Sequence, residues 1–216
     1  MSRPLSGQIV DLTLPFDNQN PRMHTEQTTF IDVQGWNITK LTFDTHAGTH
    51  LDAPSHQLPG GGSLDSIDLS RCVGPAFVCD LRHIPANQDI EISDFAPWAE
   101  RIVAGSRVVY RTDWTDRRFE PRYRDGFPCP SVACSTWLAE RGVVLLGMDT
   151  PSVGPIYRTP KDVIDVHIPL LRAGVVIVEE MANLSAVRDK DFQIVALPLR
   201  LTGLDGSPTR VIAILD

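Results

Sequence analysis

Short apolar runs without a polar side chain set the strongest limit on how this chain can fold. Residues 143–148 and 175–178 are such runs, and both are rich in valine. A strand with one wet face alternates between apolar and polar residues, so continuous runs are typical of strands covered on both faces. Other strand signals lie at residues 9–14, 36–43, 76–80, 107–112, 192–197 and 210–215. The chain therefore needs further elements to cover a central β core.

Three helix signals lie between these strands, at residues 93–103, 131–141 and 168–173. Ser93 is a suitable cap for the first helix, and Gly142 and Gly174 are suitable stops for the other two. Because strands come first and then alternate with helices, we predict an α/β fold around a central mixed β core. A chain of 216 residues is long enough to bury such a core, and we expect one domain over residues 1–216.

Composition and charge narrow the class of partner. The net charge of −7 and the pI near 5.3 argue against nucleic acid or an anionic membrane surface. No run approaches the roughly eighteen apolar residues of a membrane span. The first five residues lead into a strand-like run without an apolar signal region. The four cysteines show no zinc-ribbon spacing. We expect a cytoplasmic enzyme with mostly buried thiols and a small-molecule partner.

The segment from His46 to His56 holds three of the six histidines of the chain within eleven residues, and Asp52 lies among them. These polar residues occupy even positions, whereas small or apolar residues occupy several odd ones. An extended segment would therefore place the polar set on one face. At a rise of about 3.3 Å per residue, His46 and His50 would lie roughly 13 Å apart. The chain must bend to bring them together, and Gly48 permits the bend.

A metal site is the function that this segment favours. His46, His50 and Asp52 offer two nitrogens and one oxygen, a set suited to Zn, Mn or Fe rather than to Ca or Mg. Three protein ligands leave one coordination position open, which is typical of catalytic sites. His56 follows a bend at Pro54 and is better placed as a general acid or base beside the metal than as a ligand. The alternative is a loop whose polar side chains form only ordinary hydrogen bonds.

A second group of metal-ligating residues lies downstream. His167 precedes the third predicted helix, and Glu179 ends the buried run that follows it. The two can meet at one end of a sheet, and a carboxylate at the end of an apolar run is costly to bury unless it is paired or metal-bound. Glu180 competes with Glu179, because the sequence does not fix the register of the strand.

Two polar stretches, residues 18–29 and 115–130, are predicted to be long loops. The second contains Arg117, Arg118, Arg122 and Arg124 beside Tyr123 and Phe127, an unusual patch in an acidic chain. It is either a solvated surface loop or a lid whose arginine pairs with a substrate carboxylate.

The residues from His46 to His56 match every fixed position of HxGTHxDxPxH, the signature of the metal-dependent cyclase family that includes bacterial kynurenine formamidase and isatin hydrolase. The resemblance extends to Asp11-Leu12-Thr13, Arg111-Thr112-Asp113-Trp114, Gly147 to Val153 and His167 to Leu184. Two positions depart from it. Gly154 stands where formamidases often carry Asp, and Asp113 replaces a Gly. Neither is a metal ligand, and both bear on the choice of substrate.

The resemblance implies a swivelling β/β/α-type domain that is usually dimeric or tetrameric. It implies one or two Zn²⁺ or Mn²⁺ ions per subunit, with His46, His50 and Asp52 at the first and Asp52, His167 and Glu179 at the second. It also implies that His56 is the catalytic acid/base and that Glu180 is not a ligand.

The expected activity is metal-assisted hydrolysis of a small amide, most specifically of N-formylkynurenine to kynurenine and formate. One rival is hydrolysis of isatin or of another cyclic amide or lactone. Another is a metal-loaded binding protein without turnover, against which the presence of His56 argues. A third is a dehydratase or cyclase that acts on an acid substrate.

Overall fold

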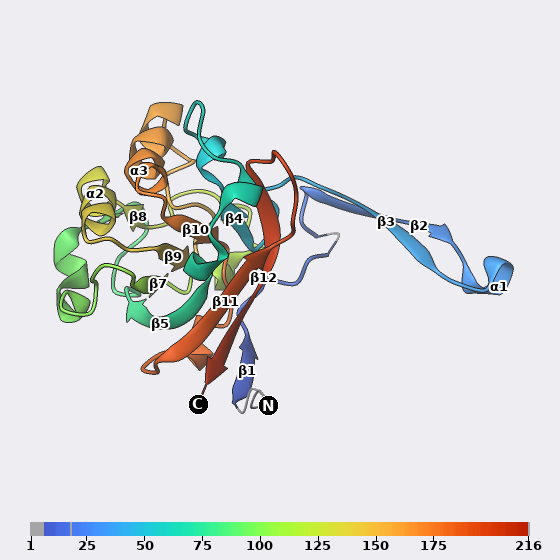
Figure 1. The fold of residues 1–216 in the computed structure, drawn as a ribbon, viewed down its shortest axis with the longest axis horizontal. Coiled ribbons are helices and arrows are strands. Elements are labelled where there is room, and N and C mark those ends of the chain that lie inside the picture. Colours follow the sequence, from blue (N-terminus) through green and yellow to red (C-terminus); the bar gives the residue numbers. More distant parts are fainter. Residues whose placement is uncertain (1–6, 18, 216) are drawn as a thin grey trace.

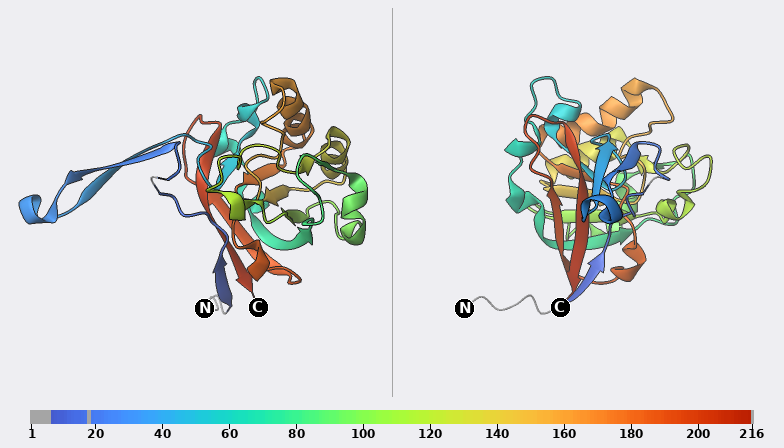
Figure 2. Two further views of the ribbon diagram at one scale, coloured as in Figure 1. Left: turned by 180° about the vertical axis from the view of Figure 1, so that it is seen from behind. Right: turned by 90° about the vertical axis from the view of Figure 1, so that its right-hand side faces the viewer.

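The computed structural model describes residues 7–17 and 19–215, so the interpretation of the first five residues as a lead into a strand falls outside the described residues. Most of the chain forms a body of one sheet with helices on one side, and a long hairpin arm projects from this body (Figure 1). Seen from behind, the arm again stands clear of the body, and in the view turned by 90° it points toward the viewer (Figure 2).

The body is a closed mixed β barrel. Its parallel half consists of β5 (Val73–Asp80), β7 (Arg107–Arg111), β9 (Leu145–Met148) and β10 (Val176–Glu179). Its antiparallel half consists of β4 (His50–Asp52), β12 (Gly206–Leu215) and β11 (Phe192–Pro198). Because β4 pairs with both β10 and β12, these strands form a ring, and β1 (Gln8–Asp11) pairs with β12 outside it.

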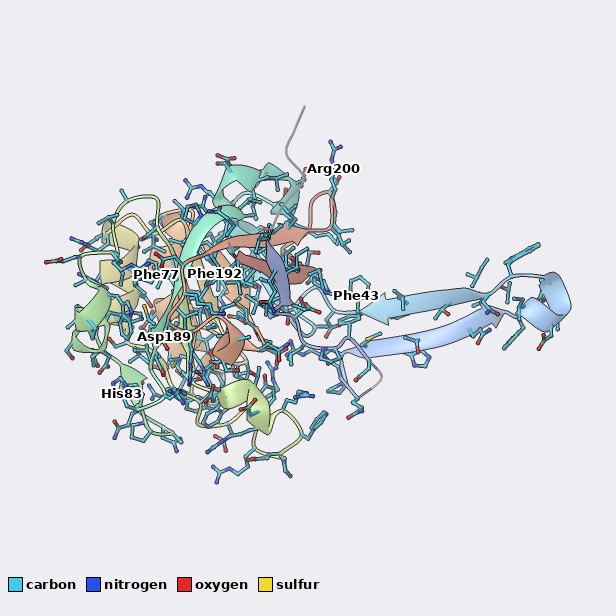
Figure 3. All side chains as sticks on the ribbon, turned by 90° about the horizontal axis from the view of Figure 1, so that it is seen from below. Phe43, Phe77, His83, Asp189, Phe192 and Arg200 are labelled. Carbon is cyan, nitrogen blue, oxygen red and sulfur yellow. The ribbon has the colours of Figure 1, made fainter. Side chains whose placement is uncertain are left out.

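Alternation along the strands divides the core into two. Val78 and Val109 point into the barrel, whereas their neighbours Phe77 and Tyr110 point outward to the helices. Figure 3 shows Phe77 within the body and Phe43 at the foot of the arm. The parallel strands are therefore covered on both faces, as their continuous apolar runs predict, and the predicted α/β class with a mixed β core is confirmed.

The second predicted helix is confirmed as α2 (Val132–Glu140). The side chain of Ser131 accepts a hydrogen bond from the Cys134 backbone N–H and caps the helix. It packs with α3 (Pro160–Arg172) over the outer face of the parallel strands. This helix layer covers the face of the barrel on which the candidate site lies.

The third helix begins eight residues earlier than predicted, and His167 lies inside it instead of before it. Thr159 and Asp162 form a reciprocal capping box, and Pro160 occupies the first turn, where its missing N–H costs nothing. The helix then continues through Pro169 to Arg172. His167 is thus held by a regular helix rather than by a loop.

The first predicted helix is wrong as an α-helix. The chain forms a 3₁₀ helix at Ile92–Trp98, capped by Glu91 and Asp94 rather than by Ser93. Pro97 lies within it and cannot donate the backbone hydrogen bond that a continuing α-helix requires.

The predicted loop at residues 18–29 is also wrong over its second half. β2 (Met23–Thr29) pairs with β3 (Ile38–Phe43), and the short helix α1 (Ile31–Gln34) joins them at the tip of the arm. A free-standing ribbon has no buried face, so β2 carries none of the apolar alternation by which strands are recognised. Asn18 lies outside the described residues.

The remaining elements are short. They are β6 (Asp89–Ile90), β8 (Cys129–Pro130) and 3₁₀ turns at Pro54–His56, Leu64–Ser66, Leu69–Arg71, Trp114–Arg117 and Leu184–Ala186. All four cysteines are buried free thiols, as predicted. No helix in the described part of the chain is long and apolar enough to cross a membrane.

Candidate metal centre

The pairing of β4 with β10 brings His50 and Asp52 to Glu179. Glu179 lies opposite His50 in the antiparallel register, and Ile177 lies opposite Asp52. Leu51 points into the barrel core, so its two neighbours point to the other face, toward the helix layer. The ends of two strands thus present three polar side chains on one wall.

The bend predicted at Gly48 is confirmed. Gly48 has a φ of +62°, in the left-handed region that glycine adopts without steric cost. The turn brings His46 back beside the strand, where its Nδ1 lies 2.9 Å from Oδ1 of Asp52 and its Nε2 lies 3.0 Å from Oδ2 of Asp205.

Helix α3 adds His167 to the same wall. Its Nε2 lies 3.6 Å from Oε1 of Glu179 and 3.9 Å from Oδ2 of Asp52. Nε2 of His50 lies 3.3 Å from Oε2 of Glu179 and 3.5 Å from Oδ1 of Asp52. Two imidazole nitrogens and two carboxylates, all almost fully buried, therefore converge on one point.

Hydrogen bonds on the far side of each ring orient these imidazoles. Nδ1 of His50 lies 2.8 Å from the carbonyl of Gly48, and Nδ1 of His167 lies 2.8 Å from the carbonyl of Val163. A carbonyl only accepts, so each Nδ1 carries the proton and donates it. When a ring is neutral, its Nε2 directs a lone pair at the carboxylates, which is the usual arrangement of metal-ligating histidines.

A cation fits this cluster. Oδ2 of Asp52 is buried and has no hydrogen-bond partner among the described residues, although buried polar atoms are nearly always satisfied. The donor atoms of His46, His50 and Asp52 lie within 4.8 Å of one another, and so do those of Asp52, His56 and His167. The nitrogen and oxygen donors suit a divalent ion such as zinc or manganese.

The pKa values show how strongly the groups depend on opposite charge. Burial alone would lower the pKa of His50 and of His167, but hydrogen bonds and the charges of Asp52 and Glu179 raise both above the ordinary 6.5. Burial alone would raise the pKa of Asp52, yet its contacts with His46 and His50 hold it well below 3.8. Without a metal, protons on the imidazoles must balance the buried carboxylates.

Burial and the charge of Asp52 would raise the pKa of Glu179, but contacts with His167 and His50 lower it to about 2. The carboxylate also accepts a hydrogen bond of 2.7 Å from the Val153 backbone N–H. Glu180 has a φ of +54°, and its side chain turns toward Arg124 instead. The structure thus groups Glu179, and not Glu180, with the two histidines.

His56 lies at the edge of the cluster, on the 3₁₀ turn that begins at Pro54. Its ring centre lies 4.0 Å from that of His46 and 5.8 Å from that of His167. Burial lowers the pKa of His56, so the imidazole is neutral near pH 7 and able to accept a proton. A cavity of about 420 Å³ opens here, lined by His46, His50, His56, His167 and Glu179 among others.

Sequence reasoning missed Asp205 and Arg22. Asp205 precedes β12 and contacts His46, and Arg22 lies at the foot of the arm and donates a 3.0 Å hydrogen bond to the His46 carbonyl. Neither residue lies in a recognisable sequence motif, and both reach the site only through contacts between distant parts of the chain.

Other residues singled out from the sequence have structural roles. Asp149 accepts hydrogen bonds from the backbone of Thr112 and Asp113, as expected for a carboxylate in a turn. Trp114 and Phe127 pack against each other in a small core rather than lining the metal cavity. At Gly154, a Cβ would lie 3.0 Å from the His167 ring, so the absence of a side chain leaves room for that imidazole.

A mixed β barrel with a buried histidine–carboxylate cluster beside a cavity is an arrangement suited to metal-assisted hydrolysis. The chain belongs to the putative cyclase family, whose model matches residues 10–155. Kynurenine formamidase from Bacillus mycoides (strain KBAB4) is 32% identical over 215 residues, covering 96% of this chain and 97% of that protein.

Solved structures agree. Isatin hydrolase A from Labrenzia aggregata superposes with a TM-score of 0.84 at 27% identity, covering 96% of this chain and 93% of its own. The enzyme from Ralstonia solanacearum gives 0.81 at 27% identity, covering 97% and 92%. The predicted family is confirmed, and the relatives support the predicted enzyme class, a metal-dependent hydrolase of carbon–nitrogen bonds.

Proposed function

We propose that the protein hydrolyses a small aryl formamide, most specifically N-formylkynurenine, to an arylamine and formate. The convergence of His50, His167 and Glu179 at the wall of the cavity, with Asp52 in contact behind them, carries this proposal. The cavity volume suits a substrate with a single ring. The 32% identity to kynurenine formamidase over nearly the whole chain supports the choice of substrate.

We further propose that the cluster holds one or two Zn²⁺ or Mn²⁺ ions. His46, His50 and Asp52 would hold the first ion, and His167 and Glu179 would share Asp52 with the second. A bound ion would supply Lewis acidity, which polarises an amide carbonyl and makes a water molecule more acidic. The orphaned Oδ2 of Asp52 and the orientation of both Nε2 lone pairs support this assignment.

His56 is proposed to take a proton from the attacking water and to deliver one to the leaving nitrogen. Its neutral ring at the rim of the cluster supports the role. A ring nitrogen of His56 also lies within 4.8 Å of ligand atoms of Asp52 and His167, so the experiment must distinguish a metal ligand from an acid/base. His56→Ala should retain the metal while kcat falls roughly 10²–10⁴-fold. Loss of metal from this variant would make His56 a ligand instead.

The decisive experiment measures formate release from N-formyl-L-kynurenine by the zinc- or manganese-loaded protein. Rapid release that a chelator abolishes and added metal restores is the expected result. Absence of release with either metal would reject this substrate.

Hydrolysis of a cyclic amide such as isatin is the second candidate. The superposition on two isatin hydrolases at 27% identity favours it. Ring opening yields no formate, so parallel assays on isatin and N-formyl-L-kynurenine separate the two activities.

We also propose a homodimer or homotetramer in the cytoplasm. The arm exposes large apolar side chains that its own body leaves uncovered: Phe30, Ile31, Val33, Trp36, Ile38 and Leu41. An apolar surface of this kind is typical of an interface, and a second copy of the chain is the partner proposed for it. Four free buried thiols fit a reducing compartment. The negative net charge supports the absence of nucleic acid and of anionic membrane as partners.

A further inference from the structure

Two arginines stand between the metal cavity and a second, smaller cavity. Arg22 and Arg124 line both the cavity of about 420 Å³ that holds the cluster and an adjoining one of about 110 Å³. Apolar and aromatic side chains such as Leu14, Phe119 and Tyr123 line part of the smaller cavity, and polar residues that include Asp17 and Glu180 line the rest. A ligand that extends from the cluster into the smaller cavity passes both guanidinium groups.

Arg22 is fixed relative to the metal centre. Its Nη1 donates to the carbonyl of His46, within the histidine motif itself. Asp44, Glu179 and Glu180 act on its charge from a distance, but no described carboxylate forms an ion pair with it. A guanidinium has five N–H donors, so most of the hydrogen-bonding capacity of Arg22 remains available to a ligand.

Arg124 is the arginine of residues 115–130 that faces the cluster. Its Nη1 lies 3.5 Å from Oε1 of Glu180, which is a single long contact. The other three arginines of this stretch are engaged elsewhere. Arg122 binds Asp125, Arg117 lies over the Trp114 ring, and Arg118 lies over the Phe119 ring.

The two guanidinium groups line the same pair of adjoining cavities. A carboxylate bound in this space could accept hydrogen bonds from both groups, and paired N–H donors match its two oxygens.

We propose that Arg22 and Arg124 bind the carboxylate of an aryl amide that carries an acid group and so hold its scissile bond at the metal centre. This inference rests on the proposed amide hydrolysis and restricts its substrates to those with a carboxylate on a ring substituent. Both arginines are substrate-binding residues that determine specificity, and the stretch of residues 115–130 supplies the predicted arginine.

The test compares two formamides. N-formyl-L-kynurenine carries a carboxylate on its amino-acid side chain, whereas formanilide is an aryl formamide without that side chain. Arg22→Gln and Arg124→Gln should raise KM for N-formyl-L-kynurenine about 10–100-fold, the range expected for a lost charge-assisted hydrogen bond. The preference for the substrate that carries the carboxylate should fall by a similar factor at unchanged metal content. Arg122→Gln, from the same stretch but paired with Asp125, is the matched control and should keep the preference.

Equal losses on both formamides, or an unchanged KM for N-formyl-L-kynurenine, would overturn the carboxylate site and leave the amide hydrolysis standing. If the wild-type protein hydrolyses neither compound, the proposed function fails, and calorimetry tests the arginines separately. The metal-loaded protein should then bind L-kynurenine more tightly than neutral 2′-aminoacetophenone, and either arginine variant should remove the difference. Equal binding of the two compounds by the wild-type protein would contradict the inference.

Discussion

Glu179 and Glu180 are adjacent in the chain, but their side chains face different partners. Glu179 lies in β10 and faces His50 and His167, whereas Glu180 has left-handed backbone angles and faces Arg124. A single pair of variants can therefore test the ligand assignment.

Glu179→Gln should lower the metal content of the protein, because it removes a charged ligand from the cluster. Glu180→Gln is the matched control, with the same change one residue later, and should retain the metal. Elemental analysis after dialysis gives the stoichiometry of each. Metal loss confined to Glu180→Gln would show that the ligand has been assigned to the wrong residue.

The metal-free protein should be most stable in mildly acidic solution. His46, His50 and His167 have raised pKa values, so their stabilising contribution is complete below 6.5 and is lost as pH rises through the raised values. Asp52 and Glu179 have lowered pKa values. Their stabilising contribution is complete above pH 3.8 for Asp52 and above pH 4.5 for Glu179, and it is lost as the pH falls toward about 2. His56, with a lowered pKa, acts in the opposite sense to the other three histidines.

Urea denaturation in the presence of a chelator measures this profile. The free energy of unfolding should be higher between about pH 4.5 and 6.5 than at pH 8. The metal-loaded protein is the control and should lose stability on acidification, because protons then compete with the ion for the imidazoles. Greater stability of the chelated protein at pH 8 would contradict the charge balance derived for the cluster.

At this scale the sequence was most informative for His46, His50, Asp52 and His56, since they lie in one short segment and local spacing already implies proximity. It could not reveal Asp205, because the approach of that residue to His46 depends on how β12 is placed.

Among the elements, the turn at Gly48 determines whether His46 can return to the strand that carries His50. Gly48→Ala should destabilise the protein by about 1–2 kcal/mol, since an L-residue is disfavoured in the left-handed region. The added Cβ would also lie 3.3 Å from the Phe16 ring, so metal affinity should fall as the turn shifts.

Gly203→Ala is the control for this variant. Gly203 has a φ of +74°, and nothing lies within 4 Å of an added Cβ. It should show the backbone cost without a change in metal affinity, as measured by competition with a chromophoric chelator. Equal metal affinity in Gly48→Ala and wild-type protein would show that the turn does not position the ligand.

The buried strands and α2 were predictable, because their apolar runs and caps are local signals. The start of α3 was missed although Thr159 and Asp162 form a capping box, since Pro169 lies within a helix that tertiary packing sustains. β2 was missed because both of its faces are exposed and its composition is that of a loop.

On the scale of the whole molecule, the arm is the part whose stability is not explained by packing against the barrel of the same chain. Val33 is 76% exposed and Trp36 is 58% exposed, near the tip of a ribbon that has few contacts with the barrel. Two-stranded ribbons are marginal alone, so a partner surface is expected to cover this one.

The double variant Val33→Ser, Trp36→Ser should therefore lower the assembly mass measured by light scattering during gel filtration. Val103→Ser, at an equally apolar but isolated position on the body, is the control and should leave the mass unchanged. If the wild-type protein is a monomer, or if the double variant keeps the wild-type mass, the arm does not mediate assembly.

The closure of the barrel was not predictable, because it depends on β4, a strand of three residues that pairs with β10 and β12. β10 follows β4 by more than a hundred residues, and the pairing of β4 with β12 needs residues 206–208, so the barrel around His50 and Asp52 can close only when nearly the whole chain has been made. The histidine segment is thus the first part of the centre to be synthesised and among the last to be enclosed.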